Sequence, residues 1–174
     1  MKDRRLSRLV LIPLFTALTA VGAQISIPLG TVPVTLQMLF VFLAGFLLNP
    51  FDAFLSMILY LTLGIAGIPV FANFSAGFQH LVGPTAGYLW AFPVAAFTIS
   101  YLRRVNYFIA GSVGLIIVYL LGWGVLGFFI KDFSKAFIVG VLPFIVVDFL
   151  KMLLSWYASR KVKKILGGVV NEEA

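Results

Sequence analysis

Six long apolar stretches, separated by short breaks, are the feature that most constrains how this chain can fold. A helix that crosses a lipid bilayer needs about 20 predominantly apolar residues. Divided among six spans, the 174 residues leave 29 for each span and its connection, whereas twelve spans would not fit. We therefore predict an all-α integral membrane protein with six transmembrane helices, which forms a single domain over residues 1–174. The stretches cover about residues 8–27, 34–48, 53–68, 85–102, 107–130 and 136–159.

The composition excludes most other classes of protein. Hydrophobic residues make up 61% of the chain and charged residues only 11%, whereas a soluble domain carries about 25% charged residues. The absence of cysteine excludes disulfides and thiolate metal sites, and the single histidine has no metal-binding or catalytic pattern around it. The Gly-x-x-x-x-Gly-Lys-Ser/Thr phosphate loop is also absent. We therefore predict a chain that is not an enzyme and holds no metal or cofactor of its own.

The basic residues predict which ends of the spans lie in the cytoplasm. Of the 13 Lys and Arg residues, ten fall at the two termini and between spans four and five, two (Lys131 and Lys135) fall in loops of the opposite side, and Lys151 falls within span six. Such a bias places both termini inside the cell, and it is unlike a basic face for nucleic acid. The clusters are Lys2, Arg4, Arg5 and Arg8; Arg103 and Arg104; and Arg160, Lys161, Lys163 and Lys164.

The connection between spans three and four, residues 69–84, is predicted to be an outward-facing cap. It is broken by Gly and Pro, which makes it a poor helix, yet it is too apolar for a plain solvated loop. Its amides, Asn73 and Gln79, can read N–H and C=O groups of a ligand, but Asn is also common in turns. His80 is more simply a loop residue, because it lacks partners for metal binding or acid–base work.

Asp148 and Lys151 are the strongest candidates for a functional site. They are three residues apart near the middle of span six, so they share one helix face. An ionised group at this depth is costly and must face the bundle interior or a cavity. Such a pair either binds a ligand or locks helix packing. Pro143, about one turn away, frees a backbone carbonyl and is expected to bend the helix, and Gln37 faces either the site or a neighbouring helix.

Small residues recur four apart on span one. Thr16 with Ala20, and Thr19 with Ala23, allow another helix to approach closely, either within this protein or in a partner. We therefore name these four residues as candidates for partner docking.

Five stretches of the chain form a recognisable series: ALTAVGAQI at 17–25, VPVTLQ at 32–37, GIPVFA at 67–72, GPTAGYL at 83–89, and LPF at 142–144 with Asp148 and Lys151. In this order they resemble the BioY family, the biotin-specific substrate-binding (S) components of energy-coupling factor transporters. Two departures from the family pattern are Val146-Val147, where a Pro-Gly pair usually precedes the aspartate, and Pro13, where an Ala-x-x-x-Ala docking motif would begin.

The resemblance implies an S-component fold in the cell membrane, capture of extracellular biotin, and two kinds of partner: a transmembrane coupling protein and two ATPases that hydrolyse ATP. Asn73, Asp148 and Lys151 match positions that resemble the family's ligand contacts. Asp148 and Asn73 suit the ureido ring of biotin, and Lys151 suits its carboxylate. Phe71 and Tyr88 are expected to form walls for the thiophane ring. Biotin and Asp148 together carry two negative charges, against the one positive charge of Lys151.

Other functions remain open from the sequence. The same scaffold could bind another vitamin. A structural or pore-forming bundle is a further alternative. A membrane enzyme that acts on lipid is disfavoured, because a catalytic constellation is missing.

Overall fold

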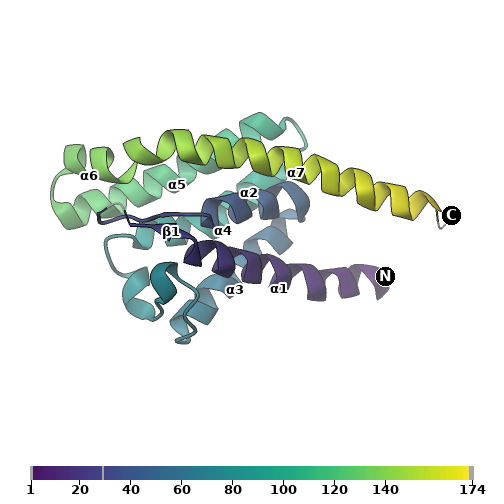
Figure 1. The fold of residues 1–174 in the computed structure, drawn as a ribbon, viewed down its shortest axis with the longest axis horizontal. Helices are drawn as coiled ribbons and strands as arrows, with labels where there is room; N and C mark the ends of the chain where they lie inside the picture. The colour runs from purple at the N-terminus through teal and green to yellow at the C-terminus, as the bar shows by residue number, and fades with distance from the viewer. Residues whose placement is uncertain (1, 29, 173–174) are drawn as a thin grey trace.

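The structure is a computed structural model, which describes residues 2–28 and 30–172, with side chains for residues 8–28 and 30–165. Most of the described chain is helical, and α1, α5 and α7 run along the long axis of the molecule (Figure 1). The helices are α1 (Lys2–Gln24), α2 (Gln37–Leu47), α3 (Pro50–Ile65), α4 (Ala86–Leu102), α5 (Tyr107–Ile130), α6 (Phe133–Gly140) and α7 (Ile145–Glu172).

The predicted count of six helical spans is confirmed, because α6 and α7 together form the sixth. Span five was expected at residues 107–130 and is observed there. The sixth span was expected over 136–159 with a bend at Pro143, and the distortion goes further than a bend: the span breaks into α6, the short 3₁₀ helix η3 (Leu142–Phe144) and α7. Pro143 lies inside η3 and lacks the N–H that would continue the helix. The break turns Phe144, which is buried, toward the interior.

The start of the second span was also predicted wrongly. Residues 34 and 35 belong to a strand, β2 (Val34–Thr35), which pairs antiparallel with β1 (Ser26–Ile27) in the register Ser26↔Thr35. Helix α1 therefore ends at Gln24, and α2 begins only at Gln37. Pro28 explains the end of α1, because the residue before a proline is driven toward extended backbone and Ile27 lies in β1. The two strands thus replace the facing ends of the two expected spans, and the segment from Pro28 to Pro33 connects them.

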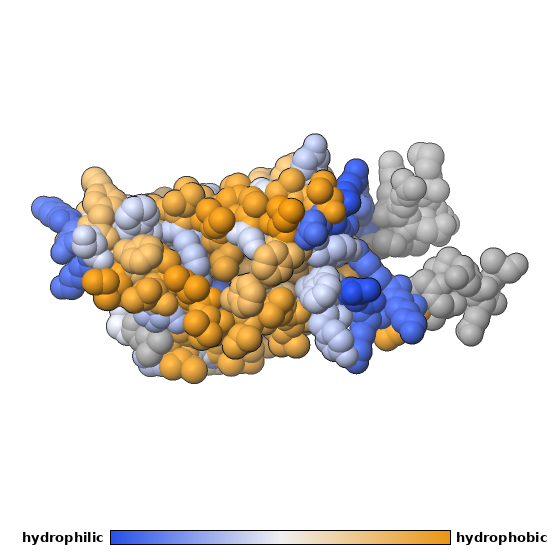
Figure 2. Space-filling model, turned by 90° about the horizontal axis from the view of Figure 1, so that it is seen from above, coloured by the Kyte–Doolittle hydropathy of each residue, from blue (hydrophilic) through white to orange (hydrophobic). Residues whose placement is uncertain are grey.

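The outer surface has an apolar belt between two polar ends (Figure 2). Two helical segments, Tyr107–Ile130 and Phe133–Ile165, are long and apolar enough to cross a membrane, and four shorter apolar helices accompany them. Large apolar side chains remain exposed on these helices; Phe128, for example, is 76% exposed. Such a belt is far larger than a soluble protein displays and indicates contact with lipid.

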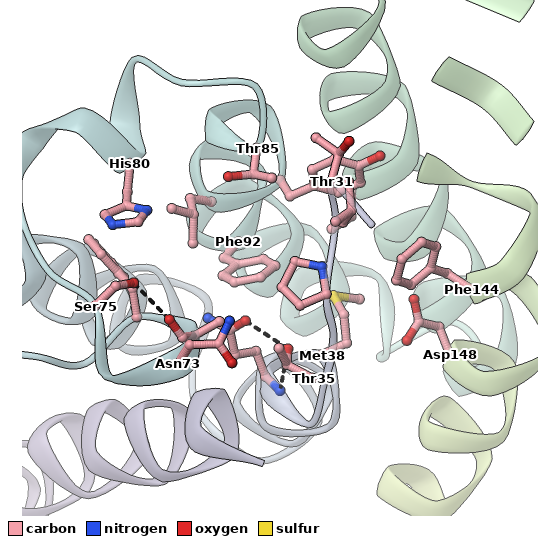
Figure 3. Close-up of a pocket in the computed structure, with 18 of the residues that line it drawn as sticks. Thr31, Thr35, Met38, Asn73, Ser75, His80, Thr85, Phe92, Phe144 and Asp148 are labelled. Carbon is pink, nitrogen blue, oxygen red and sulfur yellow. Dashed lines mark hydrogen bonds between the residues drawn. The ribbon is translucent and has the colours of Figure 1, made fainter. Parts of the chain in front are cut away.

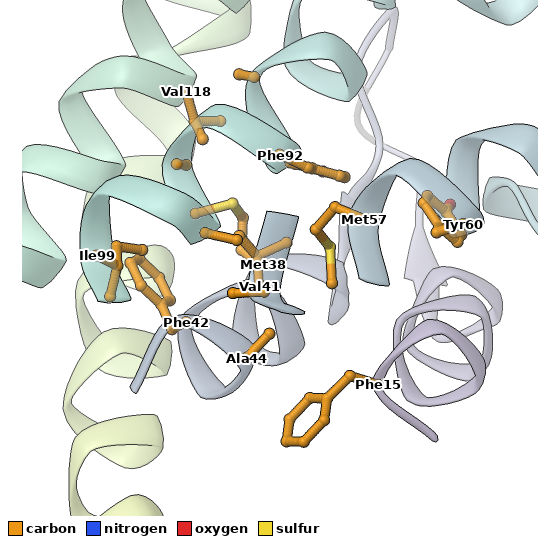
Figure 4. Close-up of a cluster of buried hydrophobic side chains, with 14 of the residues drawn as sticks. Phe15, Met38, Val41, Phe42, Ala44, Met57, Tyr60, Phe92, Ile99 and Val118 are labelled. Atoms are coloured by element: carbon orange, nitrogen blue, oxygen red, sulfur yellow. The ribbon is translucent and has the colours of Figure 1, made fainter. Parts of the chain in front are cut away.

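The interior is packed around α2, whose side chains meet those of α3 and α4 (Figure 4). Phe42, Met57, Tyr60 and Ile99 are completely buried there. Rigid packing of this kind leaves few voids and fixes the helices that surround the site.

The small residues of α1 pack within the chain. Thr16 and Thr19 are buried, and the Thr16 hydroxyl donates a hydrogen bond to the Ser56 carbonyl of α3 at 2.8 Å. Ala23 is buried and Ala20 is half-buried. Of the two alternatives that the sequence left open, these contacts correspond to packing inside the protein. The side chains of Thr16, Thr19 and Ala23 are buried within the chain, and the docking role of the four residues stays a prediction.

Candidate functional site

A cavity of about 330 Å³ lies between the hairpin, the 69–84 cap and helices α2, α4, α5 and α7 (Figure 3). Its volume is at the lower end of the range that holds small ligands in proteins. All six residues predicted to bind substrate line this one cavity, although they come from four separate parts of the chain. They are Gln37, Phe71, Asn73, Tyr88, Asp148 and Lys151.

A buried ion pair forms one wall of the cavity. The Lys151 ammonium lies 2.7 Å from a carboxylate oxygen of Asp148, and the two side chains are 8% and 5% exposed. The predicted sharing of one helix face is therefore confirmed. The ammonium also donates to the backbone carbonyl of Thr35 at 2.7 Å, which ties α7 to the hairpin. Because an ammonium carries three donors, these two bonds leave one N–H of Lys151 for a ligand in the cavity.

Tyr119 of α5 completes this cluster, and the sequence reading missed it. Its hydroxyl donates to the second carboxylate oxygen of Asp148 at 3.0 Å. A charge-assisted hydrogen bond of this kind stabilises the ionised carboxylate. The available signal was weak: a tyrosine within an apolar span is polar at one end, but only the helix packing shows which neighbour its hydroxyl reaches.

The cap folds back over the bundle and supplies the opposite wall. Phe71 and Ser75 form an isolated β-bridge, with the Phe71 N–H donating to the Ser75 carbonyl at 3.0 Å. Between them, Asn73 adopts a left-handed backbone conformation with φ 59°, which Asn tolerates better than most residues. The Phe71 ring is buried against Tyr60 and His80. The turn therefore carries both an amide and an aromatic ring to the cavity.

The Phe71 ring can lie against α3 because the helix has a glycine, Gly64, at the point of contact. A Cβ atom on Gly64 would collide with the ring. The bulk of Phe71 is thus accommodated by a missing side chain on the helix beneath the cap.

Gln37 and Tyr88 line the cavity and also hold its frame. The Gln37 amide donates to the Tyr60 hydroxyl, which in turn donates to the Val70 carbonyl at the start of the cap, 3.1 Å away. Both alternatives for Gln37, facing the site and bonding to another helix, are therefore observed. The Tyr88 hydroxyl donates to the Gly140 carbonyl at 2.7 Å, which fixes α4 to the end of α6.

Gln24, the last residue of α1, is a second residue that the sequence reading missed. Its amide N–H groups lie 3.2 Å from the Phe71 carbonyl and 3.4 Å from the Pro69 carbonyl, and its oxygen accepts from the Phe74 N–H at 2.8 Å. One side chain therefore connects α1 to both sides of the turn that carries Asn73. A polar amide at the end of an apolar span was the signal that could have pointed to it.

A bundle with an apolar outer belt and a cavity beneath a cap, lined by an ion pair, amides and aromatic rings, defines a membrane protein that binds a small molecule. Among the described residues, no group of three or more His, Asp or Glu side chains is placed to hold a metal ion. A family model, that of the BioY family, matches residues 1–168. The chain belongs to the BioY family.

Relatives and a solved structure agree with this assignment. The chain is 52% identical over 141 residues to a probable biotin transporter BioY of Pyrococcus horikoshii, covering 81% of this chain and 86% of the relative. It is 45% identical to the biotin transporter BioY of Thermotoga maritima, covering 87% and 93%. It also resembles the crystal structure of an S-component for biotin from an ECF-type ABC transporter, with a TM-score of 0.86, 26% identity and 94% of each chain covered.

The cluster predicts strong energetic coupling between Asp148 and Lys151. Removing one partner of a buried ion pair costs about 3–5 kcal/mol, whereas replacing both can be nearly neutral. We expect Asp148→Asn and Lys151→Met each to lower the free energy of unfolding in detergent by several kcal/mol, and the double variant to recover most of that loss. Denaturant unfolding of the four proteins measures the coupling. Simple additivity of the two losses would contradict it.

Proposed function

We propose that this chain captures biotin in the cavity with high affinity, as the substrate-binding component of an energy-coupling factor transporter. The observation that carries the proposal is the meeting of Lys151, Asp148 and Asn73 around one apolar-walled cavity. Membership of the BioY family supports the choice of ligand. Binding of another vitamin by the same cavity is the second candidate, and a panel of vitamins separates the two.

The groups around the cavity suit the chemistry of biotin. The ureido ring offers two N–H donors and one carbonyl, which the Asp148 carboxylate and the Asn73 amide would satisfy. The free N–H of Lys151 would meet the carboxylate of the valerate chain, and the rings of Phe71 and Tyr88 would enclose the thiophane ring. The Tyr119 hydroxyl donates a hydrogen bond to Asp148. This hydrogen bond stabilises the Asp148 charge but leaves the net charge of the site with bound biotin at minus one.

We further propose that the chain crosses the cell membrane several times as one domain, with the cap outside and both termini in the cytoplasm. Figure 1 shows the two termini at one end of the molecule, and Gln24 connects the cap to the other end of α1. Part of the charge argument rests on Lys2, Arg4 and Arg5, whose side chains lie outside the described residues. Release of the ligand would need a transmembrane coupling protein and two ATPases, because the sequence lacks a phosphate-binding loop.

Binding of labelled biotin to the purified chain in detergent, without any ATPase, tests the proposal. We expect saturable one-to-one binding at nanomolar concentrations. Asp148→Asn and Lys151→Ala should each weaken binding by at least about 100-fold, since charge-assisted contacts of buried groups contribute several kcal/mol. Lys135→Ala, an exposed lysine of the α5–α6 region, is the matched control and should bind as the wild type does.

Loss of binding must be separated from loss of folding. The double variant Asp148→Asn/Lys151→Met keeps the cavity free of an unpaired charge, so it should remain folded and monodisperse but not bind biotin. Wild-type affinity in that folded variant would contradict the assigned site. If the folded wild type does not bind biotin but binds another vitamin, that vitamin would replace biotin as the proposed ligand.

The orientation is testable because the chain has no cysteine. Lys135→Cys should react with a membrane-impermeant maleimide in intact cells. Arg104→Cys, in the turn between α4 and α5, should react only after the membrane is permeabilised. Labelling in the reverse order would place the cap on the cytoplasmic side.

Gln24 is predicted to slow the escape of ligand by holding the cap. Gln24→Leu removes its hydrogen bonds to the cap, each contributing about 1 kcal/mol, so we expect the dissociation rate of biotin to rise about tenfold or more with little change in the association rate. Gln79→Leu is the control, because among the described residues its amide donates only to the Ala76 carbonyl, which lies within the cap itself. Stopped-flow measurement of both rates provides the test. Equal dissociation rates in the two variants would contradict a holding role.

A further inference from the structure

A second hollow, of about 650 Å³, lies where α2, the start of α5 and the middle of α7 meet. It shares no lining residue with the ligand cavity. We call it the α5–α7 groove. It is lined by Phe46, Val105, Asn106, Tyr107, Phe108, Met152, Leu153, Trp156, Arg160 and Lys163.

The groove lies further along α7 than the cavity. Asp148 and Lys151 line the cavity, whereas Met152, Trp156 and Arg160, spaced four residues apart, continue along the helix from Asp148 and line the groove. The two sites therefore lie at successive levels of one helix. Neither the ligand chemistry nor the ion pair explains why this second level is hollow.

The floor of the groove is apolar and its outer wall is exposed. Phe46 and Met152 are buried, and the Tyr107 ring packs 5.5 Å from that of Phe46. Phe108 and Val105, by contrast, are 54% and 80% exposed. An apolar slot that opens sideways through exposed apolar residues offers a path for a hydrocarbon chain from the surrounding bilayer.

The rim of the groove is cationic. The Arg160 guanidinium stacks 5.5 Å from the Trp156 ring, and Lys163 lies 5.1 Å from the Tyr107 ring and donates to its hydroxyl at 2.6 Å. Trp and Tyr beside basic residues are typical of the level of lipid headgroups. Among the described residues, the lining includes no carboxylate that would neutralise these charges. Arg160 and Lys163 keep several N–H donors for an outside acceptor.

We propose that the α5–α7 groove binds an anionic phospholipid, with its phosphate on Arg160 and Lys163 and an acyl chain along Phe46, Phe108 and Leu153. The order of the groups, cationic at the rim and apolar below, matches the order of charge and hydrocarbon in that molecule. Basic pockets between membrane helices on the cytoplasmic side commonly hold such headgroups. A protein segment would have to match the same cationic rim and would not need the opening toward lipid.

Quenching of Trp156 by brominated lipid tests the proposal directly. In the variant Trp90→Phe/Trp123→Phe, Trp156 is the remaining tryptophan. We expect phosphatidylglycerol with brominated acyl chains to quench it more strongly than brominated phosphatidylcholine at the same mole fraction in vesicles. Arg160→Gln and Lys163→Gln should each lower the relative affinity for phosphatidylglycerol about fivefold, which corresponds to about 1 kcal/mol per charge. Lys131→Gln/Lys135→Gln, at the α5–α6 turn, should leave it unchanged.

Two further results complete the test. Inorganic phosphate added to the vesicles should not relieve the quenching of Trp156, because a free ion lacks the acyl chain. Full relief would show that the groove binds a phosphate ion and would overturn the proposal. Equal quenching by the two lipids, or quenching that is insensitive to Arg160 and Lys163, would also overturn it and leave the groove to a protein partner. In detergent free of phospholipid, biotin binding by the two groove variants should stay at the wild-type level, so failure here is distinct from failure of the proposed function.

Discussion

The buried pair of Lys151 and Asp148 is the interaction on which the rest of the site depends. Two charges in a membrane interior cost several kcal/mol each, and only close geometry with further hydrogen bonds offsets that cost. Here the further bonds come from the Thr35 carbonyl and the Tyr119 hydroxyl. The hairpin, α5 and α7 are thereby held in one arrangement. The hydrogen bonds that offset the cost of burying the pair therefore also hold together the wall of the cavity that the pair forms.

The cap is held by contacts of a different kind from the hydrogen bonds around the Asp148–Lys151 pair. Asn73 and Phe74 both have positive φ, at 59° and 54°, and such conformations cost of order 1–3 kcal/mol each where the surroundings do not enforce them. The cap is held mainly by the buried Phe71 ring and by hydrogen bonds from Gln24. A cap that opened to admit a ligand would have to break these contacts, whereas the bonds around the Asp148–Lys151 pair could stay in place.

The helices and the ion pair were accessible from the sequence because each depends on local spacing. Hydropathy alone located six spans, and the three-residue separation of Asp148 and Lys151 placed them on one face. The hairpin was missed because strands of two residues carry too little pattern. At Pro143 the sequence predicted a bend, but the apolar run on both sides gave no sign that the helix would break completely. Tyr119 and Gln24 were missed for another reason: their partners are 29 and 45 to 50 residues away, so only packing brings them together.

Helix α7 lines both the ligand cavity and the α5–α7 groove, so it can couple binding at one of them to binding at the other. Lys151 and Met152 are consecutive, yet the first lines the ligand cavity and the second the α5–α7 groove. A rotation or shift of α7 that tightened one site would necessarily change the other, since a helix moves as a unit in a close-packed interior. Thermodynamic linkage makes such an effect reciprocal: an occupant of the groove that alters ligand affinity by some factor must have its own affinity altered by the same factor. The membrane around the protein would then be part of its binding equilibrium.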